Sequence, residues 1–130
     1  MLVSNSGPEK EARSHPRYAV RNFVSYCYGN DRFLTATFDL GLGGMKIQTY
    51  HFLPEDEELD IRLVLGPNSV WLKGQSVYSQ LLSQGRYTSG LRFIKVSEQD
   101  RNLLKDFLAT LKDWLSPRNI QCKKAEDALQ

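Results

Sequence analysis

Three glycines within six positions mark the stretch Asp39–Gly44, which reads Asp-Leu-Gly-Leu-Gly-Gly. Glycines this dense indicate either a backbone with positive φ angles or the close approach of another group to the main chain. Apolar and β-branched residues lie on both sides, so we predict a tight turn at the end of a strand. Phosphate-loop and dinucleotide-loop patterns need a helix to begin at the glycines, whereas the residues after Gly44 alternate like a strand. Both patterns are set aside, and a hairpin without a ligand stays open.

An arginine pair, Arg13 and Arg17, lies upstream of this turn. Pro16 disfavours helix just before Arg17, so the pair is expected in an extended or bent segment that enters the first strand. Each guanidinium offers a planar fork of donors that suits phosphate oxygens or the N7/O6 edge of guanine, and a flat face that stacks on a base. Basic pairs in exposed segments are usually solvated charge, so the pair alone identifies no ligand.

Together the two stretches resemble the PilZ domain family, whose signature is R-x-x-x-R followed about two dozen residues later by D/N-x-S-x-x-G. Arg13 to Arg17 match the first element, and Asp39 to Gly44 match the second. The segment 87–93 resembles the family's G-x-x-F strand. We therefore divide the chain into a flexible N-terminal arm (1–10), a PilZ-like domain (11–115) and a C-terminal tail (116–130). One departure is that Gly41 stands where the family has serine.

The resemblance implies a receptor for the bacterial second messenger cyclic di-GMP, which binds as a ligand, with no cofactor. Carried over by motif position, Arg13 and Arg17 would grip phosphate and guanine edges or stack on a base. Asp39 would accept hydrogen bonds from the N1–H and N2–H donors of guanine. Gly41 occupies the position of the family hydroxyl, and Gly44 keeps room for the backbone beside the ligand. The outer face of the barrel would carry this site.

Three other side chains are weaker candidates for the same site. Arg92 is expected to point outward from a strand whose Leu91 and Phe93 face inward, and it could supply another guanidinium. Trp71 could offer an aromatic surface, although packing against the barrel is the simpler interpretation. His15 lies between the two arginines in sequence and could touch a ligand, or it could be solvated.

The resemblance also implies an effector, in which the ligand draws the N-terminal arm onto the barrel. The changed surface would be recognised by an unknown downstream protein of motility, adhesion or secretion. The alternative is a ligand-independent PilZ-like interaction module, which the replacement of the motif serine by Gly41 suggests. A homodimer is a further option, for which Trp114 on the C-terminal helix is the candidate contact.

The hydrophobic pattern predicts a mainly β protein, a six-stranded antiparallel barrel with a C-terminal helix. If Leu34, Ala36 and Phe38 face inward, alternation places Asp39 on the outer side. Ser97 is expected to cap the helix, which Pro117 ends. An apolar stripe on this helix should close one end or flank of the barrel. The expected strands are 18–28, the following strand to Phe38, 45–49, 59–65, 70–79 and 86–94, and the stripe comprises Leu103, Leu104, Phe107, Leu108, Leu111, Trp114 and Leu115.

Composition limits the remaining function classes. The net charge of the 130-residue chain is only +2, and no basic groove is visible, so we expect no DNA or RNA partner. A single-strand binding barrel is a weaker alternative that rests on the 14 aromatic residues. His15 and His51 are isolated, so neither an enzyme nor a metal site is expected. Cys27 and Cys122 form no disulfide framework, and no apolar run could insert into a membrane, so we expect a cytoplasmic protein.

Overall fold

The computed structural model describes residues 15–116, so the N-terminal arm, Arg13, Cys122 and nearly all of the tail lie outside the described residues. Within residues 15–116, seven strands and one helix follow one another. They are β1 (Arg17–Tyr18), β2 (Phe23–Tyr28), β3 (Asp31–Gly41), β4 (Gly44–Thr49), β5 (Glu58–Leu65), β6 (Asn68–Ser83), β7 (Arg86–Val96) and α2 (Glu98–Trp114).

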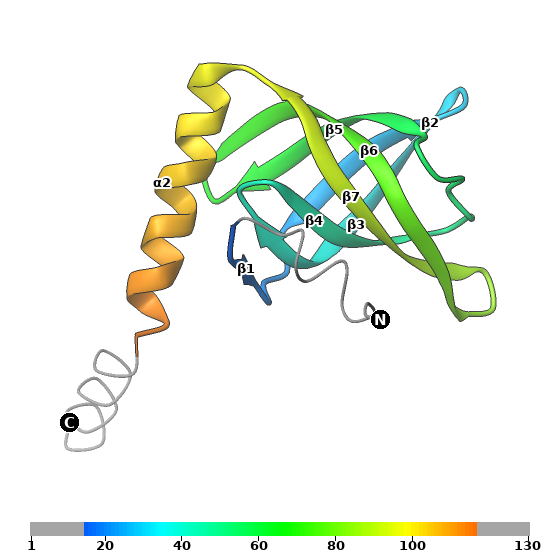
Figure 1. The fold of residues 1–130 in the computed structure, drawn as a ribbon, viewed down its shortest axis with the longest axis horizontal. Coiled ribbons are helices and arrows are strands. Elements are labelled where there is room, and N and C mark those ends of the chain that lie inside the picture. Colours follow the sequence, from blue (N-terminus) through cyan, green and yellow to red (C-terminus); the bar gives the residue numbers. More distant parts are fainter. Residues whose placement is uncertain (1–14, 117–130) are drawn as a thin grey trace, which may run out of the picture.

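Six of the strands close into an antiparallel barrel, as predicted, and Figure 1 shows their arrangement. The order along the sheet is β1-β3-β2-β5-β6-β7-β4, and an additional pairing between β3 and β4 joins the two ends. Closure removes the free edges that an open sheet would expose. The short strand β1 is an addition to the barrel, because it pairs with the last two residues of β3, at Arg17↔Gly41 and Tyr18↔Leu40.

Alternating apolar side chains fill the barrel. β5 follows the predicted pattern, with Leu59, Ile61, Leu63 and Leu65 buried. Tyr26 is also fully buried, and burial raises the pKa of its hydroxyl to about 12. That hydroxyl lies 3.1 Å from Nε2 of His51, so His51 has a structural role beside the core.

The predicted inward face of β3 is wrong. Thr35 and Thr37 are buried instead, and Leu34 is 68% exposed. The buried Thr37 hydroxyl is satisfied, because it donates to the carbonyl oxygen of Val20 at 2.5 Å and accepts from the backbone N–H of Asn22. A register shift between Thr37 and Asp39 then reverses the alternation, so Leu40 is buried and Asp39 points outward. The outward position of Asp39 is confirmed, but a β-bulge produces it.

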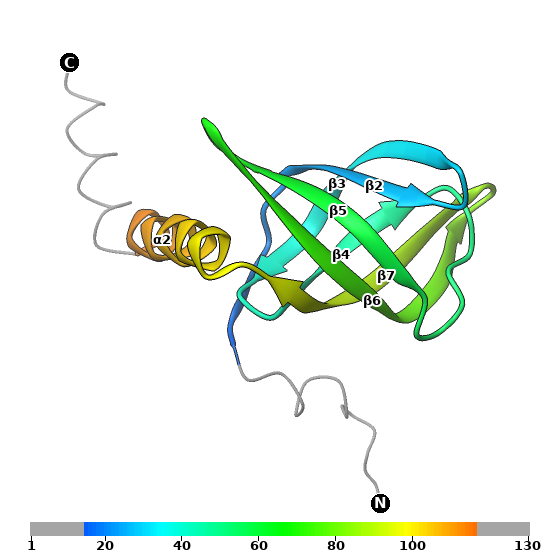
Figure 2. The same ribbon diagram turned by 90° about the horizontal axis from the view of Figure 1, so that it is seen from above.

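Helix α2 lies against one end of the barrel (Figure 2). Ser97 is the N-cap, as predicted, and its hydroxyl accepts from the backbone N–H of Asp100 at 3.1 Å. The apolar stripe is only partly covered. Leu104 and Leu108 are buried, whereas Trp114 at the far end of the helix is 61% exposed. In the part of the chain that the structure describes, no helix is long and apolar enough to cross a membrane.

Candidate functional site

The predicted site residues of β3 and β4 meet on the outer side of the barrel, on a surface that we call the glycine face. It consists of Asp39, Gly41, Gly44 and Lys46, on either side of the turn at residues 42–43. Asp39 pairs directly with Lys46 across the two strands. The turn lies at a strand end, as predicted, and the Gly43 carbonyl accepts from the backbone N–H of Phe93 at 2.9 Å, which ties the turn to β7.

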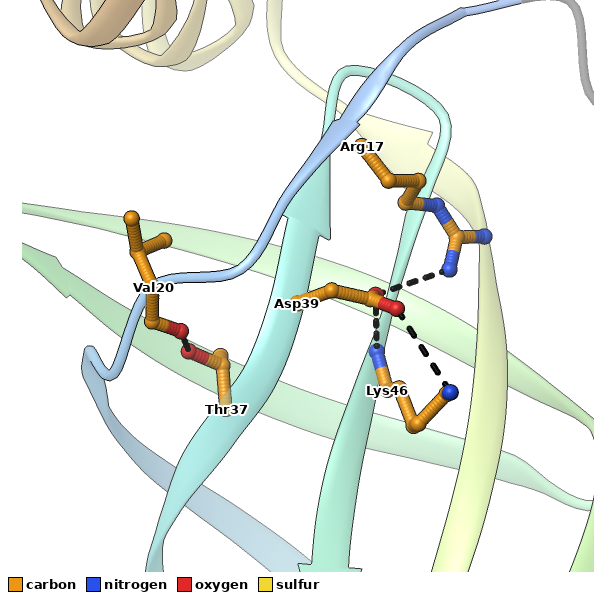
Figure 3. A network of polar contacts seen from close by, with 5 residues as sticks. All are labelled: Arg17, Val20, Thr37, Asp39 and Lys46. Carbon is orange, nitrogen blue, oxygen red and sulfur yellow. Dashed lines mark hydrogen bonds and ion pairs between the residues drawn. The ribbon is translucent and has the colours of Figure 1, made fainter. Parts of the chain in front are cut away.

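Arg17 reaches the glycine face from β1 (Figure 3). Its Nη1 lies 3.0 Å from Oδ1 of Asp39, so two residues that are 22 positions apart in sequence form an ion pair and a hydrogen bond. The side chains of Arg17 and Asp39 are 16% and 17% exposed, so water screens this pair less than an open surface pair. The structure therefore brings together one residue from each of the two predicted motif elements.

Lys46 is a site residue that the sequence prediction missed. Its backbone N–H donates to Oδ1 of Asp39 at 3.1 Å, and its Nζ lies 3.8 Å from Oδ2 (Figure 3). One carboxylate thus receives a guanidinium, an ammonium and a backbone donor. Strand alternation could have indicated Lys46, because it lies two residues after Gly44 and therefore on the same face.

The motif glycines are required by close approach, not by positive φ angles. Among the described glycines only Gly29, Gly66 and Gly85 have positive φ. A Cβ on Gly41 would lie 2.6 Å from the carbonyl oxygen of Pro16, and one on Gly44 would lie 2.3 Å from the carbonyl oxygen of Leu91. Both distances are too short for a real side chain. The departure from the family serine therefore has a physical reason, because the Pro16 carbonyl, just before β1, lies against Gly41.

Two of the weaker candidates border the glycine face. Arg92 points outward, as predicted, next to Gly44 on the neighbouring strand, and it donates a hydrogen bond to Oε1 of Gln75 on β6. The His15 ring lies 3.4 Å from the position that a Cβ on Gly43 would occupy. Gln75 was not predicted, and no sequence signal marks it. The face and its border thus carry Arg17, Lys46 and Arg92 as cations, with Asp39 between two of them.

Trp71 does not belong to this site. It lies on β6 where that strand pairs with β5, and the guanidinium carbon of Arg62 is 5.2 Å from the centre of its ring. Packing against the barrel is only part of its environment, because the side chain is 54% exposed.

The glycine face can bind an anion and can accept hydrogen bonds through one carboxylate. Its cations supply charge and directed donors for phosphate oxygens, while Asp39 supplies an acceptor for N–H groups. Within residues 15–116, no three His, Cys, Asp or Glu side chains are grouped so that they could hold a metal ion.

The sequence matches the PilZ domain over residues 11–110, so the chain belongs to the PilZ domain family. A comparison with curated proteins gives no match. Among solved structures, the fold is similar to the inhibitor of motility MotI/DgrA of Bacillus subtilis, with a TM-score of 0.68 and 12% identity over 80% of this chain and 53% of that one.

Two further similar structures are complexes with c-di-GMP. YcgR from Escherichia coli has a TM-score of 0.66 and 18% identity over 91% of this chain and 50% of that one. MrkH from K. pneumonia has a TM-score of 0.68 and 17% identity over 82% of this chain and 54% of that one. This chain spans about half the length of these three structures. At these identities the likeness shows the PilZ fold.

Proposed function

We propose that the protein is a bacterial signalling effector that binds cyclic di-GMP on the glycine face. The observation that carries the proposal is the contact between Arg17 and Asp39, which joins the two motif elements on one side of the barrel. Arg17 would bind phosphate or the guanine N7/O6 edge, and Asp39 would accept from the guanine N1–H and N2–H groups. The family of the chain and the ligands named for YcgR and MrkH support the same ligand.

Binding would change the partners of Arg17. Its guanidinium is 3.0 Å from Asp39, so a phosphate or guanine must compete with that carboxylate. Asp39 would keep the backbone N–H of Lys46, which holds it at 3.1 Å, and could exchange Arg17 for the guanine donors. Such an exchange would rearrange the segment around β1 and Arg13 and present a new surface to a downstream protein of motility, adhesion or secretion. We expect no enzymatic activity from this site.

Calorimetric titration with cyclic di-GMP, beside cyclic di-AMP and GTP, tests the proposal. Saturable binding of cyclic di-GMP with little or no heat from the two controls is the expected result, because Asp39 and the arginines would recognise guanine together with the cyclic phosphates. Absence of binding at high micromolar concentration would contradict it.

A ligand-independent interaction module is the second candidate function. The observation in its favour is that the Pro16 carbonyl already covers Gly41 and that Arg17 is already paired. Hydrogen exchange separates the two functions, since an effector should change amide protection at Arg17 and Tyr18 when cyclic di-GMP is added. A module without a ligand should show the same exchange with and without the nucleotide.

A further inference from the structure

A cavity of about 470 Å³ lies on another part of the barrel surface, between the first turn of α2 and the outer faces of the strands. We call it the Trp71 groove. Its volume is in the range of small-molecule sites. One part of its wall is apolar and the other carries charges. The lining residues are Cys27, Arg32, Asp60, Trp71, Leu72, Lys73, Lys95, Val96, Ser97 and Asp100.

Strand register assembles the cations of the groove in a cross-strand row. Lys73 pairs with Lys95 on one side and with Asp60 on the other. Arg32 belongs to the same wall and donates to the Ser25 hydroxyl at 2.6 Å. These residues come from β3, β5, β6 and β7, so no stretch of sequence carries the row.

The charges of the groove are unequally matched. Asp60 lies 3.4 Å from Nζ of Lys73, and the Asp100 carboxylate accepts from the backbone N–H of Trp71 at 3.1 Å. Within residues 15–116, Arg32 and Lys95 form no ion pair. The lining thus carries three cations and two carboxylates, and Lys95 at one end of the row has no ion-pair partner among the described residues, a condition that favours an anionic ligand beside it.

The exposed ring of Trp71 adds a second requirement for a ligand of the groove. Trp71 is 54% exposed although a tryptophan offers a large area for burial, and Arg62 supports its ring at 5.2 Å. A flat ring of a ligand can stack on such an indole. An anion alone would use only the cations, and an apolar group alone would leave the cations unmatched.

From these features we infer that the Trp71 groove binds a nucleotide unit, either free or as part of a single strand. The base would stack on Trp71, and its phosphate would bind Lys95, which pairs with Lys73 on the neighbouring strand. This site is separate from the glycine face and does not depend on cyclic di-GMP binding there. The inference departs from the expectation of no DNA or RNA partner, which depended on the absence of a basic groove in the sequence.

The test uses adenine, so that a guanine-specific glycine face does not respond. The isotope-labelled full chain is titrated with AMP, adenosine, inorganic phosphate, the single strand (dA)10 and a ten-residue poly-glutamate peptide, and amide and indole resonances are followed. AMP should shift the Trp71 indole N–H and the amides of Lys95 and Ser97, while adenosine and phosphate should each bind at least about tenfold more weakly.

The strand distinguishes the two sources of the nucleotide. Binding of (dA)10 at least about tenfold tighter than AMP, with a steep loss in salt, would assign the groove to single strands. Equal or weaker binding of (dA)10 would assign it to free nucleotides. Absence of shifts with both, or equal binding of poly-glutamate, would overturn the inference.

Matched variants localise the binding. Trp71→Ala and Lys95→Ala should each weaken AMP binding by about tenfold or more, whereas Trp71→Phe keeps a stacking ring and should lose less. The control is Lys112→Ala, which removes an exposed cation from the last turn of α2 and should have no effect. Unchanged AMP affinity in folded Trp71→Ala, judged by its thermal melt, would refute the site. Arg17→Ala should keep AMP binding, so failure of the glycine face and failure of the groove give different results.

Discussion

The glycine face and the Trp71 groove both concentrate positive charge on the barrel, but they balance it differently. On the glycine face, Arg17 and Lys46 are turned toward the single carboxylate of Asp39. In the groove, Lys73 has Asp60, whereas Arg32 and Lys95 have no ion-pair partner among the described residues. On the glycine face, the groups that would bind a ligand are therefore already paired with each other. In the groove, part of the positive charge is exposed to solvent.

The two regions also differ in what limits a ligand. On the glycine face a ligand must displace a partner of Arg17, so binding and rearrangement are coupled. In the groove the indole and Lys95 are available without displacing a carboxylate from an ion pair. We therefore expect a guanine-specific, conformation-changing response in the first region and a weaker, salt-sensitive response in the second.

Replacing one residue in either region should weaken ligand binding in that region only. Arg17→Ala should weaken cyclic di-GMP binding by about 10- to 150-fold, because a hydrogen bond to a charged group contributes about 1.5–3 kcal/mol. Arg13→Ala should act in the same direction. AMP binding to the groove should be unchanged in both variants, as measured by calorimetry and by the Trp71 indole resonance.

Trp71→Ala is the reciprocal control. It should lose AMP binding and keep cyclic di-GMP binding, because Trp71 pairs with Arg62 of β5 and is not a residue of the glycine face. Loss of both ligands in either single variant would show that the two regions are one site or that the fold is damaged, and a thermal melt separates these outcomes.

A methyl group at Gly44 should destabilise the whole barrel. A Cβ there would lie 2.3 Å from the carbonyl oxygen of Leu91, and both residues belong to the β4–β7 pairing that closes the barrel. We expect Gly44→Ala to cost about 1–3 kcal/mol of unfolding free energy, the usual cost of overpacking. Gly43→Ala is the matched control, since its Cβ would meet only the His15 ring at 3.4 Å. Urea unfolding compares the two, and equal midpoints would contradict the packing argument.

The glycine face could largely be predicted because its residues follow fixed spacings. Strand alternation and the family signature placed Arg17, Asp39 and the glycines in one site. The barrel followed from apolar periodicity, and the Ser97 cap from the capping-box pattern of Ser97 to Asp100. The bulge between Thr37 and Asp39 could not be predicted. The residues that face inward just before it are Thr35 and Thr37, and their polar side chains give no apolar signal for the inward face. A glycine in the sequence also does not indicate which backbone segment will lie against it in the fold.

The Trp71 groove could not be predicted from the sequence for a different reason. Its cations come from three strands, and Arg32 and Lys95 are 63 residues apart in sequence, so only the pairing of the strands brings them to one groove. A low net charge of +2 concealed them further. Composition reports the sum of charges, whereas a ligand responds to their local arrangement.

The same substitution should have opposite effects in the two regions. Asp39→Asn should weaken cyclic di-GMP binding about tenfold, or about 1.4 kcal/mol, because the amide is a poorer acceptor for guanine donors and no longer balances Arg17 and Lys46. Asp60→Asn should strengthen AMP binding about twofold, since it removes a negative charge and frees Lys73. Parallel titrations of both variants measure this contrast. Weaker AMP binding by Asp60→Asn would mean that the acid itself contacts the ligand.

The smallest effect concerns the position at which this chain departs from its family. Gly41→Ser would place a Cβ 2.6 Å from the Pro16 carbonyl, so β1 must move before the serine hydroxyl can contact a ligand. Because Pro16 precedes a strand of only two residues, the cost should be local and about 1 kcal/mol, at the lower end for overpacking. Amide exchange at Arg17 and Tyr18 should accelerate, while exchange in β5 and β6 stays unchanged.

Gly43→Ser supplies the control for this last comparison, because a side chain there meets only the His15 ring. It should leave exchange at Arg17 and Tyr18 as in the wild type. If Gly41→Ser binds cyclic di-GMP more tightly at an unchanged melting temperature, the missing hydroxyl matters more than the docking of β1. A second outcome is that Gly41→Ser binds more weakly while amides of β1 exchange faster. The contact between the Pro16 segment and Gly41 is then needed for binding, and the family's serine is incompatible with that contact in this chain.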